Sequence, residues 1–164
     1  MILLLNSIIP FILILSIFIV LIRGIYIISN NLKINIYKEL IDLLFILYVV
    51  SLFYMLTYKS LNPNWTTVNY KIFNEIFRYK VFSQMFITET IGNLLIFIPF
   101  GFFVAYYLNL KKVYILLLIA LIISISIELI QLKIGRVCDI DDVLLNNLGS
   151  IVGYFIFKIK YIEK

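Results

Sequence analysis

The chain has 164 residues, 63% of them apolar, and a mean hydropathy of +1.08, which is too apolar for a small soluble domain that must cover its surface with polar groups. One cysteine, Cys138, and no histidine exclude an intrachain disulfide, a Ser-His-Asp triad and a zinc site built from cysteine and histidine. The net charge of +5 suits lysines at a membrane surface, and no basic module indicates nucleic acid as a partner.

Five long apolar segments predict an all-α integral membrane protein, because the strands of a membrane barrel would instead alternate in hydropathy over about ten residues. Most segments approach the roughly 20 residues that a helix needs to cross a hydrocarbon core of about 30 Å, and the last is short. We therefore expect one membrane domain over residues 1–164, a bundle of about five transmembrane helices. The segments are 2–22, 40–58, 90–108, 113–130 and 143–157.

The first segment is expected to be a retained helix rather than a secretory signal peptide. It lacks a basic start and a small-residue cleavage site, and Arg23 follows its apolar run. Alternate connections hold eight Lys and Arg residues on one side and six on the other, with four of the six in the longest loop, where the positive-inside rule is weaker. This bias predicts an N-terminus outside and a C-terminus inside the cell.

The longest connection, residues 59–89, joins the second and third segments. Its apolar residues recur at approximately helical spacing, and charged residues between them are available for a polar face. This pattern is compatible with an interfacial or re-entrant helix. It is equally compatible with an ordinary extracellular loop that packs over the bundle, and both interpretations stay open.

The fourth segment ends in polar residues that a membrane helix does not need. Glu128 lies 16 residues after Lys112, about 24 Å along a helix and still inside the bilayer. A carboxylate at that depth must be paired, protonated or in contact with water, which makes Glu128 a functional candidate. Ser124 and Gln131 share its helical face, and Arg136 in the next turn is the expected counter-ion.

The third and last segments place polar residues at the same end. Asp142 stands where it would cap the last helix, and Asn146, Gly149 and Gly153 continue a polar and then small-residue face suited to close helix contact. Asn93 lies about 27 Å from the inner end of the third segment. If these helices adjoin, one group forms near the outer face, either as a binding or catalytic pocket or as a hydrogen-bond network that holds short helices together. Its members are Asn93, Glu128, Gln131, Arg136, Asp139, Asp142 and Asn146.

Motifs in a fixed order carry a family resemblance. They are NLLIFIPFG at 93–101, SIELIQ at 126–131, RVCDIDD at 136–142 and NNLG at 146–149, followed by Gly153. In this order they resemble the VanZ-like family of small bacterial membrane proteins over about residues 40–160, with Asn147 where Thr is common. The resemblance implies a multi-pass protein of the bacterial cytoplasmic membrane and a link to low-level resistance against teicoplanin-type lipoglycopeptides, whose target is cell-wall precursor. It supplies no mechanism.

Two hypotheses of different class follow. In the leading one, the polar group is an outer-leaflet pocket without a cofactor that engages a lipid-linked cell-wall precursor or the drug, with Arg136 on a phosphate or carboxylate. The alternative is an integral membrane enzyme, in which Glu128 is an acid or base and Asp139 and Asp142 hold a divalent cation. No strong metal-ligand spacing or nucleophile motif is present, so no metal site is predicted. A transporter is disfavoured, because the inner halves of the segments carry no polar path.

Overall fold

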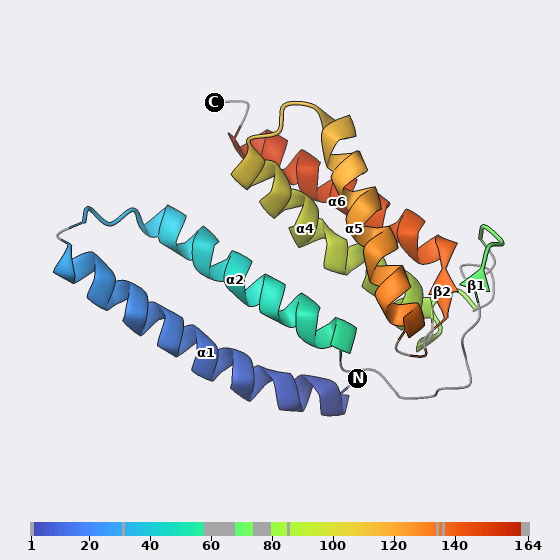
Figure 1. The fold of residues 1–164 in the computed structure, drawn as a ribbon, viewed down its shortest axis with the longest axis horizontal. Helices are drawn as coiled ribbons and strands as arrows, with labels where there is room; N and C mark the ends of the chain where they lie inside the picture. Colours follow the sequence, from blue (N-terminus) through green and yellow to red (C-terminus); the bar gives the residue numbers. More distant parts are fainter. Residues whose placement is uncertain are drawn as a thin grey trace. The chain divides into compact units, whose positions relative to one another are not determined.

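The structure is a computed structural model that describes residues 2–30, 32–57, 68–73, 80–84, 86–133, 135 and 137–161. Helices dominate the described residues, which confirms the all-α prediction (Figure 1). Contacts within the chain divide it into two units, Met1–Tyr58 and Lys59–Lys164. Each unit is described by itself.

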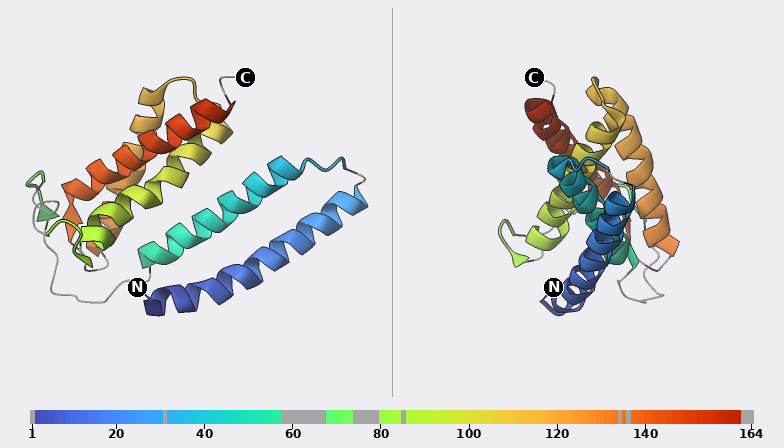
Figure 2. Two further views of the ribbon diagram at one scale, coloured as in Figure 1. Left: turned by 180° about the vertical axis from the view of Figure 1, so that it is seen from behind. Right: turned by 90° about the vertical axis from the view of Figure 1, so that its left-hand side faces the viewer.

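Unit 1 is a pair of helices joined by a short connection. Helix α1 (Ile2–Ser29) and helix α2 (Ile36–Thr57) contact each other and lie side by side in Figure 1 and in the left view of Figure 2. Many of their apolar side chains are exposed, among them Ile14, Ile17 and Phe18. Surface of this kind would be unfavourable in water and is suited to contact with lipid.

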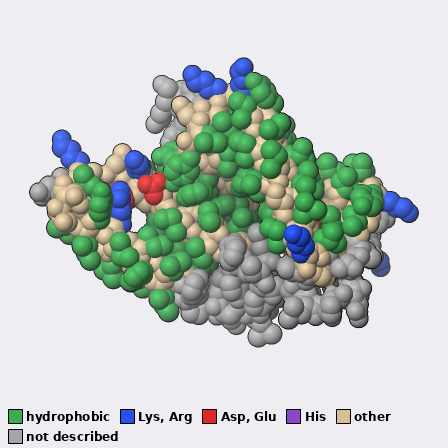
Figure 3. Space-filling model, viewed as in Figure 1, with side chains coloured by type: hydrophobic (Ala, Val, Ile, Leu, Met, Phe, Trp, Pro, Cys, Tyr) green, Lys and Arg blue, Asp and Glu red, His purple; other side chains and the backbone are tan. Residues whose placement is uncertain are grey.

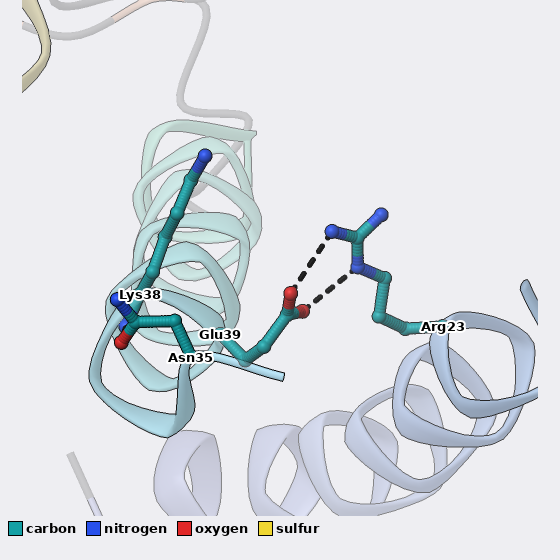
Figure 4. A network of polar contacts seen from close by, with 4 residues as sticks. All are labelled: Arg23, Asn35, Lys38 and Glu39. Carbon is teal, nitrogen blue, oxygen red and sulfur yellow. Dashed lines mark hydrogen bonds and ion pairs between the residues drawn. The ribbon is translucent and has the colours of Figure 1, made fainter. Parts of the chain in front are cut away.

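Polar contacts organise the connected ends of α1 and α2 (Figure 4). Arg23 donates two hydrogen bonds to the carboxylate of Glu39, with Nε–Oε2 at 2.7 Å and Nη2–Oε1 at 2.9 Å. This bound guanidinium lowers the pKa of the Glu39 carboxyl. Asn35 caps α2, because its Oδ1 accepts from the backbone N–H of Lys38 at 3.2 Å. Arg23 and Glu39 lie just outside the expected spans.

Unit 2 contains the remaining helices. A π-helix, η1 (Phe86–Ile91), leads into α4 (Gly92–Leu108), and α5 (Val113–Lys133) and α6 (Ile140–Tyr161) follow. Helix α4 continues through Pro99. Helices α4 and α6 run in the same direction and make the closest helix contact of the unit. Helix α5, which lies between them in the sequence, runs in the opposite direction (Figure 1).

Glycines allow the close contact of α4 with α6. A Cβ atom at Gly149 would collide with the backbone carbonyl of Leu94, and one at Gly153 would collide with that of Ile98. The backbones therefore approach one another more closely than any larger residue permits, which is the packing expected of a small-residue face in a membrane helix. The prediction made for Gly149 and Gly153 is confirmed.

A short parallel sheet ties the long connection to the turn before α6. Strand β1 (Val68–Asn69) pairs with β2 (Cys138–Asp139), and Asn69 is the register partner of Asp139. The described part of the connection before Ser83 consists of this strand and turns. Residues 74–79 and Met85, on which part of the expected interfacial helix falls, lie outside the described residues.

Among the residues whose side chains the structure describes, two helices are both long and apolar enough to cross a membrane. These are Val113–Lys133 and Ile140–Lys160, whereas the apolar stretches Ile14–Ser29 and Gly92–Leu108 are shorter. The remaining spans of the five-helix bundle stay a prediction.

Candidate functional site

Buried polar side chains gather where α5 ends and α6 begins. Such groups are costly to bury unless they are hydrogen-bonded, so their concentration at one end of unit 2 distinguishes that end from the apolar remainder. We call this group the polar cluster. Among the described residues its members are Ser124, Glu128, Gln131, Asp139, Asp141, Asn146 and Ser150.

Glu128 joins α5 to the turn that precedes α6. Its side chain is only 3% exposed, and its Oε2 accepts a hydrogen bond from the backbone N–H of Asp139 at 2.9 Å. A backbone donor therefore compensates part of the cost of burying this carboxylate. The counter-ion expected from the sequence, Arg136, lies outside the described residues.

Asp139 caps helix α6. Its Oδ1 accepts from the backbone N–H of Asp141 at 2.9 Å, which satisfies a donor in the first turn of the helix. Asp142 was expected in this role, but it is already the third residue of α6 and lies half-buried within the first turn. The helix begins earlier than expected because Asp139, and not Asp142, supplies the terminal acceptor.

Residues 68–73, which we call the strap, are hydrogen-bonded to the polar cluster. Asn69 Nδ2 donates to Asp139 Oδ2 at 2.9 Å, and the backbone N–H of Phe73 donates to Asp141 Oδ1 at 2.6 Å. Phe73 has a φ of 65°, a left-handed conformation that is uncommon for a bulky residue. Sequence reasoning missed Asn69 and Asp141 as members of this site, because these contacts join residues about 70 positions apart and leave no local signal.

Asn146 connects α6 to α5 below the capped turn. Its Nδ2 donates to the hydroxyl oxygen of Ser124 at 2.7 Å, and its backbone carbonyl accepts from Ser150 Oγ at 2.9 Å. Ser124 and Glu128 both turn toward the buried side of α5, as their spacing of four residues predicts. The structure therefore brings together the fourth and last segments at their polar residues.

The other candidate residues lie at the edge of this arrangement. Gln131 is buried at the end of α5. Asn93 is half-buried in the first turn of α4, next to Leu94, whose carbonyl contacts Gly149. No hydrogen bond joins Asn93 to the polar cluster within the part of the chain that the structure describes.

The cluster has a negative electrostatic character, as the pKa of the neighbouring Cys138 thiol indicates. Burial raises the pKa of the Cys138 thiol, and the charges of Glu128, Asp139 and Asp142 raise it further. A thiolate is therefore disfavoured at neutral pH, and Cys138 is unsuited to act as a nucleophile.

The described polar groups mainly satisfy one another. No buried side-chain nitrogen or oxygen in the described ranges lacks a hydrogen-bond partner. Nor do those ranges contain three or more His, Cys, Asp or Glu side chains grouped as metal ligands. Chemically, the cluster is rich in acceptors and suited to N–H and O–H donors.

The sequence model of the VanZ/LLP1 family matches residues 45–161. The chain belongs to the VanZ/LLP1 family. This confirms the resemblance expected from the motifs. Comparison with curated proteins and with solved structures found no match.

The VanZ/LLP1 region contains the strap and the whole polar cluster, whereas α1 and the Arg23–Glu39 pair precede it. Its motifs occupy neighbouring positions in unit 2, at the start of α4, the end of α5 and the capped turn of α6. Family membership and the two long apolar helices together support a membrane protein.

Proposed function

We propose that this VanZ/LLP1 protein is a multi-pass protein of the bacterial cytoplasmic membrane, with about five spans, an outside N-terminus and an inside C-terminus. In this arrangement the polar cluster lies near the outer leaflet. It engages an amphiphile, either a lipid-linked cell-wall precursor or a teicoplanin-type lipoglycopeptide, and thereby contributes to resistance against such drugs.

The observation that carries this proposal is the burial of Glu128 beside Asp139 at one end of unit 2. A membrane protein retains buried carboxylates only against a cost, which favours a role in ligand contact. Counting spans from an outside N-terminus assigns the turn between α5 and α6 to the outer side, where wall precursors and the drug meet the membrane.

The chemistry of the expected ligands fits the residues available. Cell-wall precursors and lipoglycopeptides carry sugar hydroxyls and peptide N–H groups. The carboxylates and the amide oxygen of Asn146 would accept hydrogen bonds from these groups. Arg136 would contact a phosphate or carboxylate. Exposed apolar side chains on the same part of α5, Leu129 and Ile130, would accept an acyl chain.

The test is resistance in a teicoplanin-sensitive bacterium that expresses the parent or single variants at equal membrane levels. The variants are Glu128→Gln, Arg136→Ala and Asp142→Asn. The matched control is Ser126→Ala, because the hydrogen bond of the Ser126 hydroxyl in the described part of the chain goes to the Ile122 carbonyl of its own helix. We expect the parent and the control to raise the inhibitory concentration of teicoplanin relative to vancomycin, and the three variants to lose this effect.

Two results would count against the proposal. If the parent protects against neither drug, the resistance role is wrong for this protein. If the three variants disappear from the membrane while Ser126→Ala remains, the polar cluster is first of all a structural network.

An integral membrane enzyme is the second candidate, favoured by the same burial of Glu128 next to further carboxylates. It predicts that the purified protein consumes a lipid-linked substrate, with or without added divalent cation. A folded Glu128→Gln variant would then bind that substrate but not convert it. Binding without turnover in the parent would favour the pocket.

A further inference from the structure

The end of unit 2 opposite the polar cluster carries a group of lysines that the proposed function does not use. Exposed side chains come from the α4–α5 connection and from the last turns of α6. Figure 3 shows Lys or Arg side chains in blue at the end of unit 2 where Figure 1 places this connection and the end of α6. We call this group the lysine end; it comprises Lys111, Lys112, Lys158 and Lys160.

The two parts of the lysine end are held against each other. The hydroxyl of Tyr154, a residue only 3% exposed, donates to the backbone carbonyl of Lys111 at 2.8 Å. Lys158 follows Tyr154 by four residues and therefore lies on the same face of α6, one turn further on. The ammonium groups of Lys111, Lys112 and Lys158 thus project from backbones that are neighbours in space.

A packed core fixes these backbones. Leu110 is buried beside Ala105, Leu116 and Phe157, and Asn109, with a φ of 47°, ends α4 in the left-handed conformation typical of a helix C-terminus. The lysines are consequently attached to backbone that is already held by packing. Ligand binding would therefore not have to order this backbone first.

Aromatic and apolar side chains flank the lysines. Tyr114 is 60% exposed, and the Lys112 ammonium lies 5.6 Å from its ring centroid. Tyr107 and Leu108 are exposed at the end of α4, and Leu118 is exposed one turn beyond Tyr114 on α5. Tyrosine beside exposed aliphatic surface is typical of the level at which lipid headgroups meet acyl chains.

The helices supply no acid of their own at this end. The sequence contains no carboxylate side chain between Glu89 and Glu128, nor between Asp142 and Glu163. Glu163 follows α6 outside the described residues. The acids of α5 and α6 lie at the other end of helices that are about 30 Å long, beyond the screening distance of about 8 to 10 Å in physiological salt.

We propose that the lysine end binds the headgroups of anionic phospholipids. Lys111, Lys112 and Lys158 contact the phosphate, the tyrosine rings lie at the level of the glycerol, and the acyl chains follow the exposed apolar side chains of α4 and α5. A lipid is favoured over soluble phosphate because only a lipid uses this flanking apolar surface. This inference rests on the membrane location proposed above, but the polar cluster takes no part in it, so loss of ligand binding at that cluster would leave the lipid site unaffected.

The test measures lipid preference of the purified full chain in neutral detergent. Native mass spectrometry would compare retention of phosphatidylglycerol with that of phosphatidylcholine. We expect the parent to prefer phosphatidylglycerol, and a variant combining Lys111→Ala, Lys112→Ala and Lys158→Ala to lose about a hundredfold of that preference. The corresponding Lys→Arg variant should retain it, because charge and donors are kept.

The matched control removes the same charge elsewhere, by Lys33→Ala, Lys38→Ala and Lys71→Ala, and should keep the parental preference. The proposal is overturned if the triple alanine variant prefers phosphatidylglycerol as the parent does, or if the control loses the preference equally. Displacement of the lipid by millimolar inorganic phosphate would also overturn it, in favour of a simple anion site. If the triple variant is not produced, Lys158→Glu alone must lower the preference.

Discussion

Asp139 illustrates how a single residue joins three parts of unit 2. Its backbone N–H donates to Glu128, its Oδ1 accepts from the N–H of Asp141, and its Oδ2 accepts from Asn69. The end of α5, the start of α6 and the strap therefore depend on one buried side chain and its own peptide group. Helix capping and strap attachment are separate energetic contributions of this carboxylate.

Replacing Asp139 separates these contributions. Asp139→Ala removes the cap, which contributes about 1 kcal/mol, and the bond to Asn69, which contributes about another 1 kcal/mol, so we expect a loss of about 2 kcal/mol in the free energy of unfolding. Asp139→Asn should cost less, because Asn also caps helices well. Unfolding in mixed micelles, followed by circular dichroism, measures both. Ser126→Ala is the control, and an Asp139→Ala variant as stable as that control would contradict the capping role.

At the scale of elements, the contact between α4 and α6 holds the site in place. This contact lies directly beside the polar cluster, since Gly149 follows Asn146 by one turn and packs against Leu94. Gly101 on α4 meets the backbone of Ser150 in the same way. Because backbone atoms and not flexible side chains occupy the space beside each glycine, the helices cannot accommodate an added methyl group without moving apart.

Gly153→Ala is the smallest change that tests this contact. Its Cβ would collide with Ile98 and Phe102 backbone atoms, so we expect the free energy of unfolding to fall by about 1 to 3 kcal/mol. Gly24→Ala is the control, because a Cβ at Gly24 in α1 meets nothing within 4 Å and alanine favours a helix. The same unfolding assay compares the two variants. Equal stability of both would show that α4 and α6 are not packed through Gly153.

At the scale of the whole molecule, the described helices of unit 2 are electrically polarised. Within α5 and α6 the carboxylates lie at the end where these two helices meet, and lysines are displayed at the end where α4 meets α5. A membrane between these ends would have the lysines on its cytoplasmic side, as the positive-inside rule requires. The proposed outside position of the polar cluster agrees with this polarity, which comes from the same lysines that set the predicted orientation.

Sidedness can be measured with single cysteines in a Cys138→Ser background. We expect Lys71→Cys, in the strap, to react with a membrane-impermeant maleimide in intact cells. Lys112→Cys should react only after the cells are permeabilised, because the α4–α5 connection is expected inside. Both side chains are exposed, so burial does not explain a difference between them. Reversed labelling would invert the proposed orientation.

Local sequence patterns were sufficient to predict most helices and the family. Long apolar runs predict helices because each helix satisfies its own backbone, and the motifs around Asn93, Glu128 and Asp142 indicate the family without knowledge of any contact. The face formed by Gly149 and Gly153 was likewise predictable, since residues four apart adjoin on a helix. Helix ends were predicted less well, because caps such as Asp139 depend on backbone geometry.

Tertiary structure decided which donors satisfy the buried acids. The sequence suggested Arg136, which lies outside the described residues, as the partner of Glu128. A donor that the structure does describe is the backbone N–H of Asp139, a group present at almost every residue and hence invisible in a sequence pattern. Asn69 reaches Asp139 across 70 positions through a two-residue parallel strand pair. Hydropathy and periodicity are local properties, whereas pairing of distant segments is fixed only when the chain folds.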